Sequence, residues 1–217
     1  MRRALAGWAV LLAVALGLAF WLGSATPVRT VRPGGDRLGP QSGQSVAEYL
    51  ASARESLAAA PAGERRWALV SPAAPWSADD AWTRLGSLDR IGRVLVRVSI
   101  PGVATPTATV PPGQSAEGVA AVPELAALAM PGLAAPGPRG QAVARVTAAR
   151  LRAGAPAIVG IVVLGSGDAL RAAAGRPGVR SVQVMPDDGA RFGLSALLPS
   201  YTVAATPGPD DRPVPRS

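Results

Sequence analysis

The chain has 217 residues, of which 48% are hydrophobic and 17% are charged, and its formal net charge at pH 7 is +8. It contains no cysteine and no histidine, which excludes disulfides, thiol nucleophiles and the commonest general base and transition-metal ligand. All 22 basic residues are arginine, and they occur at most in pairs without interleaved aromatic residues. We therefore expect no cofactor, no metal and no nucleic-acid partner.

An uncharged apolar segment at residues 4–22 is the strongest feature of the chain. As a helix of 19 residues it spans roughly 28 Å, which is close to the thickness of the hydrocarbon core of a bilayer. Aromatic residues lie near both of its ends, where they suit the membrane interface. We expect residues 1–25 to form a signal-anchor transmembrane helix. Its membrane-contacting residues would include Trp8, Leu12, Leu16, Phe20 and Trp21.

Two features of this segment leave alternatives open. Residues 23–25 (GSA) would also serve as the cleavage site of a signal peptide, although a usual signal core is shorter. Arg2 and Arg3 favour a cytoplasmic N-terminus, whereas three arginines between residues 29 and 37 weaken that bias. We expect a single-pass protein of the cell membrane with an extracytoplasmic domain.

The first half of the chain after the anchor predicts a helix–strand–helix–strand order. Residues 26–44 are rich in proline and glycine and predict a flexible tether. A capping box at residues 45–48 begins a helix that ends near residue 60. Residues 67–71 predict a strand, and a second helix begins after Ser77. Residues 93–100 alternate between apolar and polar side chains, which is typical of a strand with one buried face.

The same order returns in the second half, after a proline-rich insertion at residues 101–138. The insertion holds eight prolines, which predict a long loop with a short helical turn near residues 124–129. Its threonines and prolines are also compatible with O-glycans. A helix over residues 140–153 and an almost wholly apolar strand over 157–164 follow.

The last predicted elements complete one domain, residues 45–205. A helix begins after the turn at residues 165–168, a strand covers 179–185, and residues 206–217 predict a disordered tail. Two β-α-β units of this kind would share one sheet. We therefore expect an α/β (α+β) fold, namely a two-layer ferredoxin-like sandwich with about four strands and helices on one face.

The sharpest local motif is the turn at Ser166 and Gly167, where a buried strand enters a helix. Free N–H groups at a helix N-terminus can hold an anion, and Arg171 lies one turn further on. This predicts an anion-binding site at Ser166, Gly167 and Arg171. The alternative is an ordinary turn in which Ser166 or Asp168 caps the helix.

The sequence offers little for catalysis. Asp79 and Asp80 could be a carboxylate pair, but neighbouring residues of a helix do not share a face, and negative charge in a first turn stabilises the helix. No serine lies in a Gly-x-Ser-x-Gly elbow. We expect the protein not to be an enzyme.

The apolar segment, residues 37–43 (RLGPQSG), the capped helix and residues 176–180 (RPGVR) resemble membrane-anchored proteins of high-G+C Gram-positive bacteria, a group without an established function. The resemblance implies membrane attachment and transfers no site residues. Three functions stay open: an envelope protein with a non-catalytic binding domain and a protein partner, a module that binds anionic ligands or lipid headgroups, and an enzyme with carboxylate chemistry.

Overall fold

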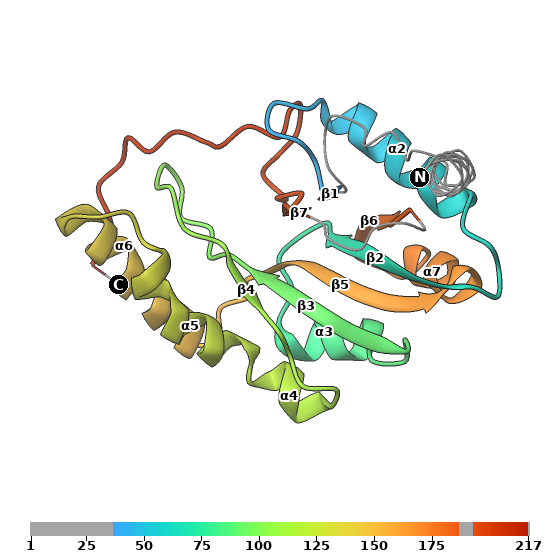
Figure 1. The fold of residues 1–217 in the computed structure, drawn as a ribbon. Coiled ribbons are helices and arrows are strands. Elements are labelled where there is room, and N and C mark those ends of the chain that lie inside the picture. The colour runs from blue at the N-terminus through green and yellow to red at the C-terminus, as the bar shows by residue number, and fades with distance from the viewer. Residues whose placement is uncertain (1–36, 187–192, 217) are drawn as a thin grey trace, which may run out of the picture. The chain divides into compact units, whose positions relative to one another are not determined.

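The computed structural model describes residues 37–186 and 193–216, which belong to one compact unit (Figure 1). The predicted anchor at residues 1–25 and most of the predicted tether lie outside the described residues. None of the helices within the described ranges is long and apolar enough to cross a membrane.

The predicted helix–strand–helix–strand order is present in both halves of the chain, with further elements around it. The first half contains β1 (Arg37–Leu38), α2 (Val46–Ala58), β2 (Arg65–Pro72), α3 (Ala78–Leu85), β3 (Arg90–Val96) and β4 (Ala108–Val110). The second contains α4 (Ala116–Ala120), α5 (Val122–Leu133), α6 (Pro138–Arg152), β5 (Ile158–Ser166), α7 (Gly167–Ala174), β6 (Val179–Val184) and β7 (Gly193–Leu194).

The main sheet has five strands in the order β4-β3-β5-β2-β6, and every neighbouring pair is antiparallel. The units β2-α3-β3 and β5-α7-β6 interleave, so β5 lies between β2 and β3. The expectation of one sheet shared by two β-α-β units is therefore confirmed. The expectation of about four strands is wrong by one, because β4 pairs with β3 from within the proline-rich insertion.

Both faces of the sheet are buried, each by a different part of the chain. Val94 and Ile161 pack in the core beneath the helices α3 to α7. On the opposite face Leu69, Leu95 and Val162 pack against residues 194–201 and Leu38. Helix α2 covers this second side, where its Tyr49 packs with Leu197 (Figure 1), so the expectation of helices on one face only is wrong. The prediction that β3 has one buried face is wrong, because Leu95 is 2% exposed on the face expected to meet water.

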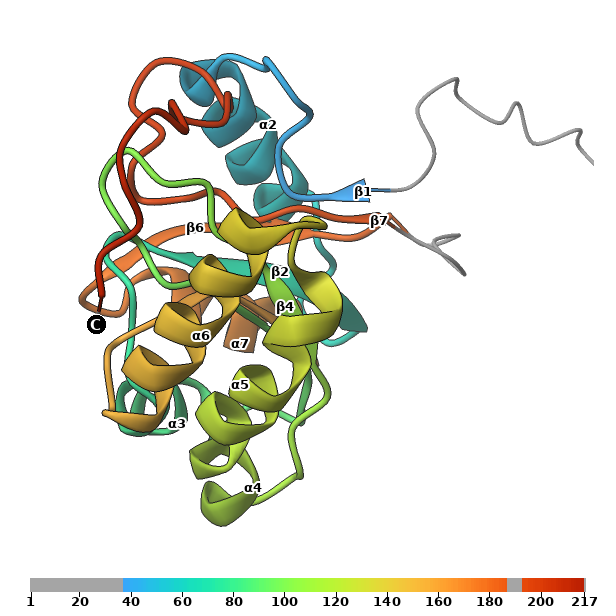
Figure 2. The ribbon, with the colours of Figure 1, turned by 90° about the vertical axis from the view of Figure 1, so that its left-hand side faces the viewer.

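The insertion at residues 101–138 is largely ordered secondary structure rather than a long loop. It contains β4, α4 and α5, and α5 packs beside α6 (Figure 2). Of the two prolines of α5, Pro123 lies in the first turn, whose N–H groups have no partner within the helix, whereas Pro131 lies inside the helix, two residues before its end.

The two ends of the described chain are held against the domain. Residues 37–44, expected to be tether, include β1, which pairs with β7. Gly39 has a φ of 102° and leaves no room for a side chain against Ser195. The prediction of a disordered tail is wrong for residues 206–216, which lie along the domain. The backbone N–H of Arg212 donates to Gly102 O at 2.9 Å.

Candidate functional site

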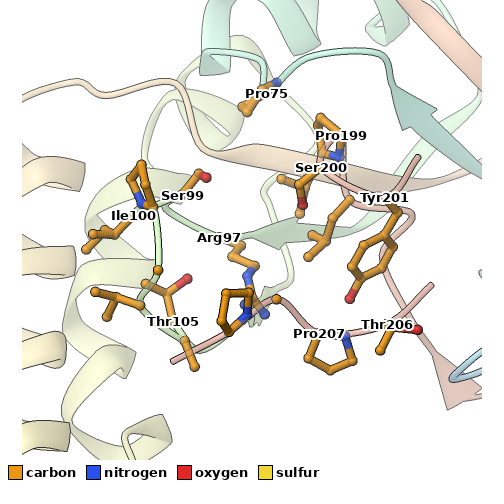
Figure 3. Close-up of a pocket in the computed structure, with 18 residues that line it drawn as sticks. Pro75, Arg97, Ser99, Ile100, Thr105, Pro199, Ser200, Tyr201, Thr206 and Pro207 are labelled. Atoms are coloured by element: carbon orange, nitrogen blue, oxygen red, sulfur yellow. The ribbon is translucent and has the colours of Figure 1, made fainter. Parts of the chain in front are cut away.

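A cavity of about 460 Å³ lies at the end of the sheet where β2 and β3 finish and β5 begins (Figure 3). Its walls come from Pro75 after β2, from residues 97–105 after β3, from Val159 of β5 and from residues 198–209. Most of these side chains are prolines, aliphatic residues and small hydroxyl residues. The site is therefore mainly apolar with a few polar groups, which is typical of a small-molecule pocket.

Two sets of contacts hold the C-terminal wall in place. Arg180 of β6 donates to Leu198 O at 3.1 Å and to Tyr201 O at 2.7 Å. Further along, Asp210 accepts from the backbone N–H of Ala104 at 2.9 Å and pairs with Arg139. The wall is thus fixed at both ends to parts of the chain far away in sequence.

Among the described residues, Arg97 is the only charged one that lines this cavity. Its backbone N–H donates to Ala157 O at 2.8 Å, which fixes the strand end, and its guanidinium donates to Thr107 Oγ1 at 3.4 Å. Burial lowers the pKa of Arg97, and the neighbouring Tyr201 acts in the opposite direction. Within the described part of the chain, Arg97 has no carboxylate at ion-pair distance.

A second hollow of about 270 Å³ adjoins the first and shares Arg97, Leu198 and Tyr201 with it. Thr107, Thr109 and Ser195 add hydroxyl groups to its wall. The guanidinium of Arg97 therefore borders an apolar space on one side and a hydroxyl-lined space on the other. A half-buried cation without a counter-ion is costly, and an anionic ligand would relieve that cost.

The predicted anion site at Ser166, Gly167 and Arg171 is brought together at the start of α7, but its donors are used within the chain. The Ser166 side chain accepts from the N–H of Ala169 at 3.2 Å, so it caps the helix. The N–H of Asp168 donates to Ala62 O at 3.2 Å, and Arg171 donates to Ala60 O at 2.9 Å. This geometry favours the capping alternative.

Gly167 has a packing role at this turn. A side chain there would overlap the carbonyl oxygens of Ala60 and Pro61. Those carbonyls also close off the α7 N-terminus. Arg171 pairs in addition with Asp168 at 2.8 Å. The three predicted residues join the end of α2 to the start of α7.

Asp80 is part of a helix cap rather than a carboxylate pair. Its backbone N–H donates to Ser77 Oγ at 3.0 Å, its carboxylate accepts from Ser77, and it pairs with Arg84. These contacts hold the pKa of Asp80 below its usual range. The described residues contain no cluster of acidic side chains that could hold a metal ion. The predicted anchor residues Trp8, Leu12, Leu16, Phe20 and Trp21 lie outside the described residues.

The alternating pattern of residues 93–100 does not indicate Arg97, because it places this side chain on the solvent-facing side of the predicted strand. One signal could have found it. An arginine stands four residues before the Pro101-Gly102 turn at the end of an apolar strand, where a chain often borders a cleft. Tyr201 gave no local signal at all.

No family model, no curated protein and no solved structure matches this chain significantly.

Proposed function

We propose that this protein is a single-pass, membrane-anchored envelope protein whose extracytoplasmic domain binds a ligand in the Arg97 cavity without catalysing a reaction. The apolar segment at residues 4–22 supports the anchor, since its length suits a bilayer. The half-buried Arg97 without a carboxylate partner among the described residues is the observation that carries the binding site. The cavity lining offers hydroxyl groups but no carboxylate, histidine or cysteine to act as a base.

The ligand we propose is a small organic carboxylate. A carboxylate matches the planar fork of a guanidinium, so the negative group would lie at Arg97 beside Thr107. The apolar body would occupy the hollow between Ile100 and Pro207, where prolines and aliphatic side chains exclude water. Tyr201 would border both parts.

We also propose that the sheet core has the ferredoxin-like arrangement. Strands β3-β5-β2-β6 are antiparallel, and each β-α-β unit places its strands two positions apart, as in a split β-α-β fold. On this view β4 and α4 to α6 are additions at the β3 edge, and α2 covers the opposite face.

Ligand-observed NMR on the full chain in detergent micelles tests the binding site. The probes are benzoate and benzamide, which have the same ring and differ in charge. We expect saturation transfer to benzoate but little to benzamide. Arg97→Gln should raise the Kd of benzoate at least about tenfold, because one charge-assisted hydrogen-bond pair is lost. Arg93→Gln is the matched control, because Arg93 is exposed on β3, four residues before Arg97.

Equal binding of the two probes, or binding that survives in Arg97→Gln, would reject the carboxylate site. Protease accessibility on intact spheroplasts tests the anchor separately. The domain should be digested from outside while a membrane-embedded fragment remains. Protection of the domain would reject the extracytoplasmic location but leave the cavity hypothesis standing.

A further inference from the structure

The outer face of α5 is apolar and exposed. Leu125, Leu128 and Leu133 are 44%, 64% and 45% exposed, although large aliphatic side chains in a folded domain are usually covered. Leu125 and Leu128 lie one turn apart on the outer side of α5, and Leu133 lies at the end of the helix, about 140° around it from Leu128. Residues 125–138 contain no charged side chain. The exposed side of α5 is therefore a continuous apolar surface.

A basic border runs beside this surface on α6, which lies alongside α5 (Figure 2). Both helices line a hollow of about 600 Å³, with Leu128 and Pro131 of α5 on one side and Arg145 and Arg152 of α6 on the other. Arg152 pairs with Glu124 at 3.1 Å, whereas Arg145 is exposed and has no ion-pair partner in the described ranges. Aliphatic side chains beside arginine are the combination that binds an anionic lipid surface.

We propose that the α5–α6 surface docks on an anionic lipid bilayer, with the leucines of α5 inserted and Arg145 at the headgroups. This inference rests on the proposed membrane anchor, which would keep the domain close to the bilayer. The 14 residues between Leu22 and β1 could span at most about 50 Å when fully extended. Residues 37–217 hold 18 arginines and 13 acidic residues, so the domain itself has a net charge of +5, which favours the same partner.

The absence of native cysteine allows one dye to be placed at a chosen site. The full chain carrying Leu128→Cys, labelled with an environment-sensitive fluorophore, is reconstituted into vesicles of equal parts phosphatidylglycerol and phosphatidylcholine. Val203→Cys is the matched control, since Val203 is 80% exposed and lies far from α5 in the sequence. We expect a blue shift and about a twofold rise in emission at position 128 only. The emission change at position 128 should be smaller in vesicles of pure phosphatidylcholine and at high salt.

Arg145→Gln should weaken the emission change at position 128. Arg54→Gln on α2 removes the same charge from an exposed position elsewhere and should leave it unchanged. A labelled chain that floats with the vesicles but shows no difference between positions 128 and 203 overturns the docking surface and leaves the anchor intact. A chain that does not float with the vesicles would contradict both the docking surface and the membrane anchor. An emission change at position 128 that depends on protein density instead of lipid charge would reject lipid docking. It would identify a second copy of the chain as the partner of the α5–α6 surface.

Discussion

Replacing Arg97 by methionine separates the stability of the domain from its proposed binding function. The change removes a half-buried positive charge and its single long hydrogen bond to Thr107, at 3.4 Å. Loss of such a bond costs about 0.5–1 kcal/mol. Methionine has a similar volume and avoids the free-energy cost of desolvating a cation. We expect the free energy of unfolding to stay the same or to rise by up to about 2 kcal/mol.

Urea unfolding of the full chain in micelles, followed by tryptophan fluorescence, measures this difference. Benzoate at ten times its Kd should stabilise the natural chain by about 1.4 kcal/mol and should leave Arg97→Met unchanged. Arg93→Met is the control, since Arg93 is exposed on β3 four residues before Arg97, and it should change the free energy of unfolding by less than about 0.5 kcal/mol. A loss of more than about 2 kcal/mol in Arg97→Met would show that Arg97 serves the fold, and the reasoning would be refuted.

Three further predictions test the packing and the pH dependence. Leu69→Ala should lower the free energy of unfolding by about 2.7–5 kcal/mol, since Leu69 is 0% exposed in the core on the second face; a loss below about 1 kcal/mol in urea unfolding would contradict that core. Gly167→Ala should lower the free energy of unfolding by about 1–3 kcal/mol, because its methyl group would overlap backbone carbonyls. Gly175→Ala is the control, since a methyl group there meets only an oxygen at 3.6 Å. Equal unfolding midpoints of the two variants would contradict this close packing. The pKa of Asp80 is lowered by Arg84 and the helix cap, so the stability it contributes is present at neutral pH and is lost as the pH falls below about 4; Asp80→Asn should reduce that pH dependence, and an unchanged acid-unfolding curve would count against it.

The elements that depend on local patterns were predicted well from the sequence. The apolar run at residues 157–164 predicts a central strand, and β5 is the middle strand of the sheet with both faces covered. The N-caps at Ser45 and Ser77 are also confirmed, because each side chain accepts from a backbone N–H three residues later, and the full capping box is formed at Ser77. A cap involves only neighbours in the sequence, so its residues predict it directly.

The elements that depend on distant contacts were missed. The prolines of residues 101–138 predict a loop, but Pro123 and Pro138 occupy first turns, where proline is compatible with a helix. The order of residues 206–216 depends on Asp210 and Arg139, which are 71 positions apart, and periodicity carries no information about such a pair. Arg97 was missed for the same reason. Its surroundings come from the C-terminal segment, which no pattern within the strand reveals.

The C-terminal wall of the cavity has a consequence for the order of events during synthesis. In chain order the first contributor to the lining is Pro75 and the last is Pro209, and the strands of the main sheet all come before residue 185. A nascent chain can form most of the sheet while it still lacks this wall. The site is therefore completed only after residues 198–209 have been made, and a chain that stops before residue 206 should fold into a domain with an open groove at Arg97.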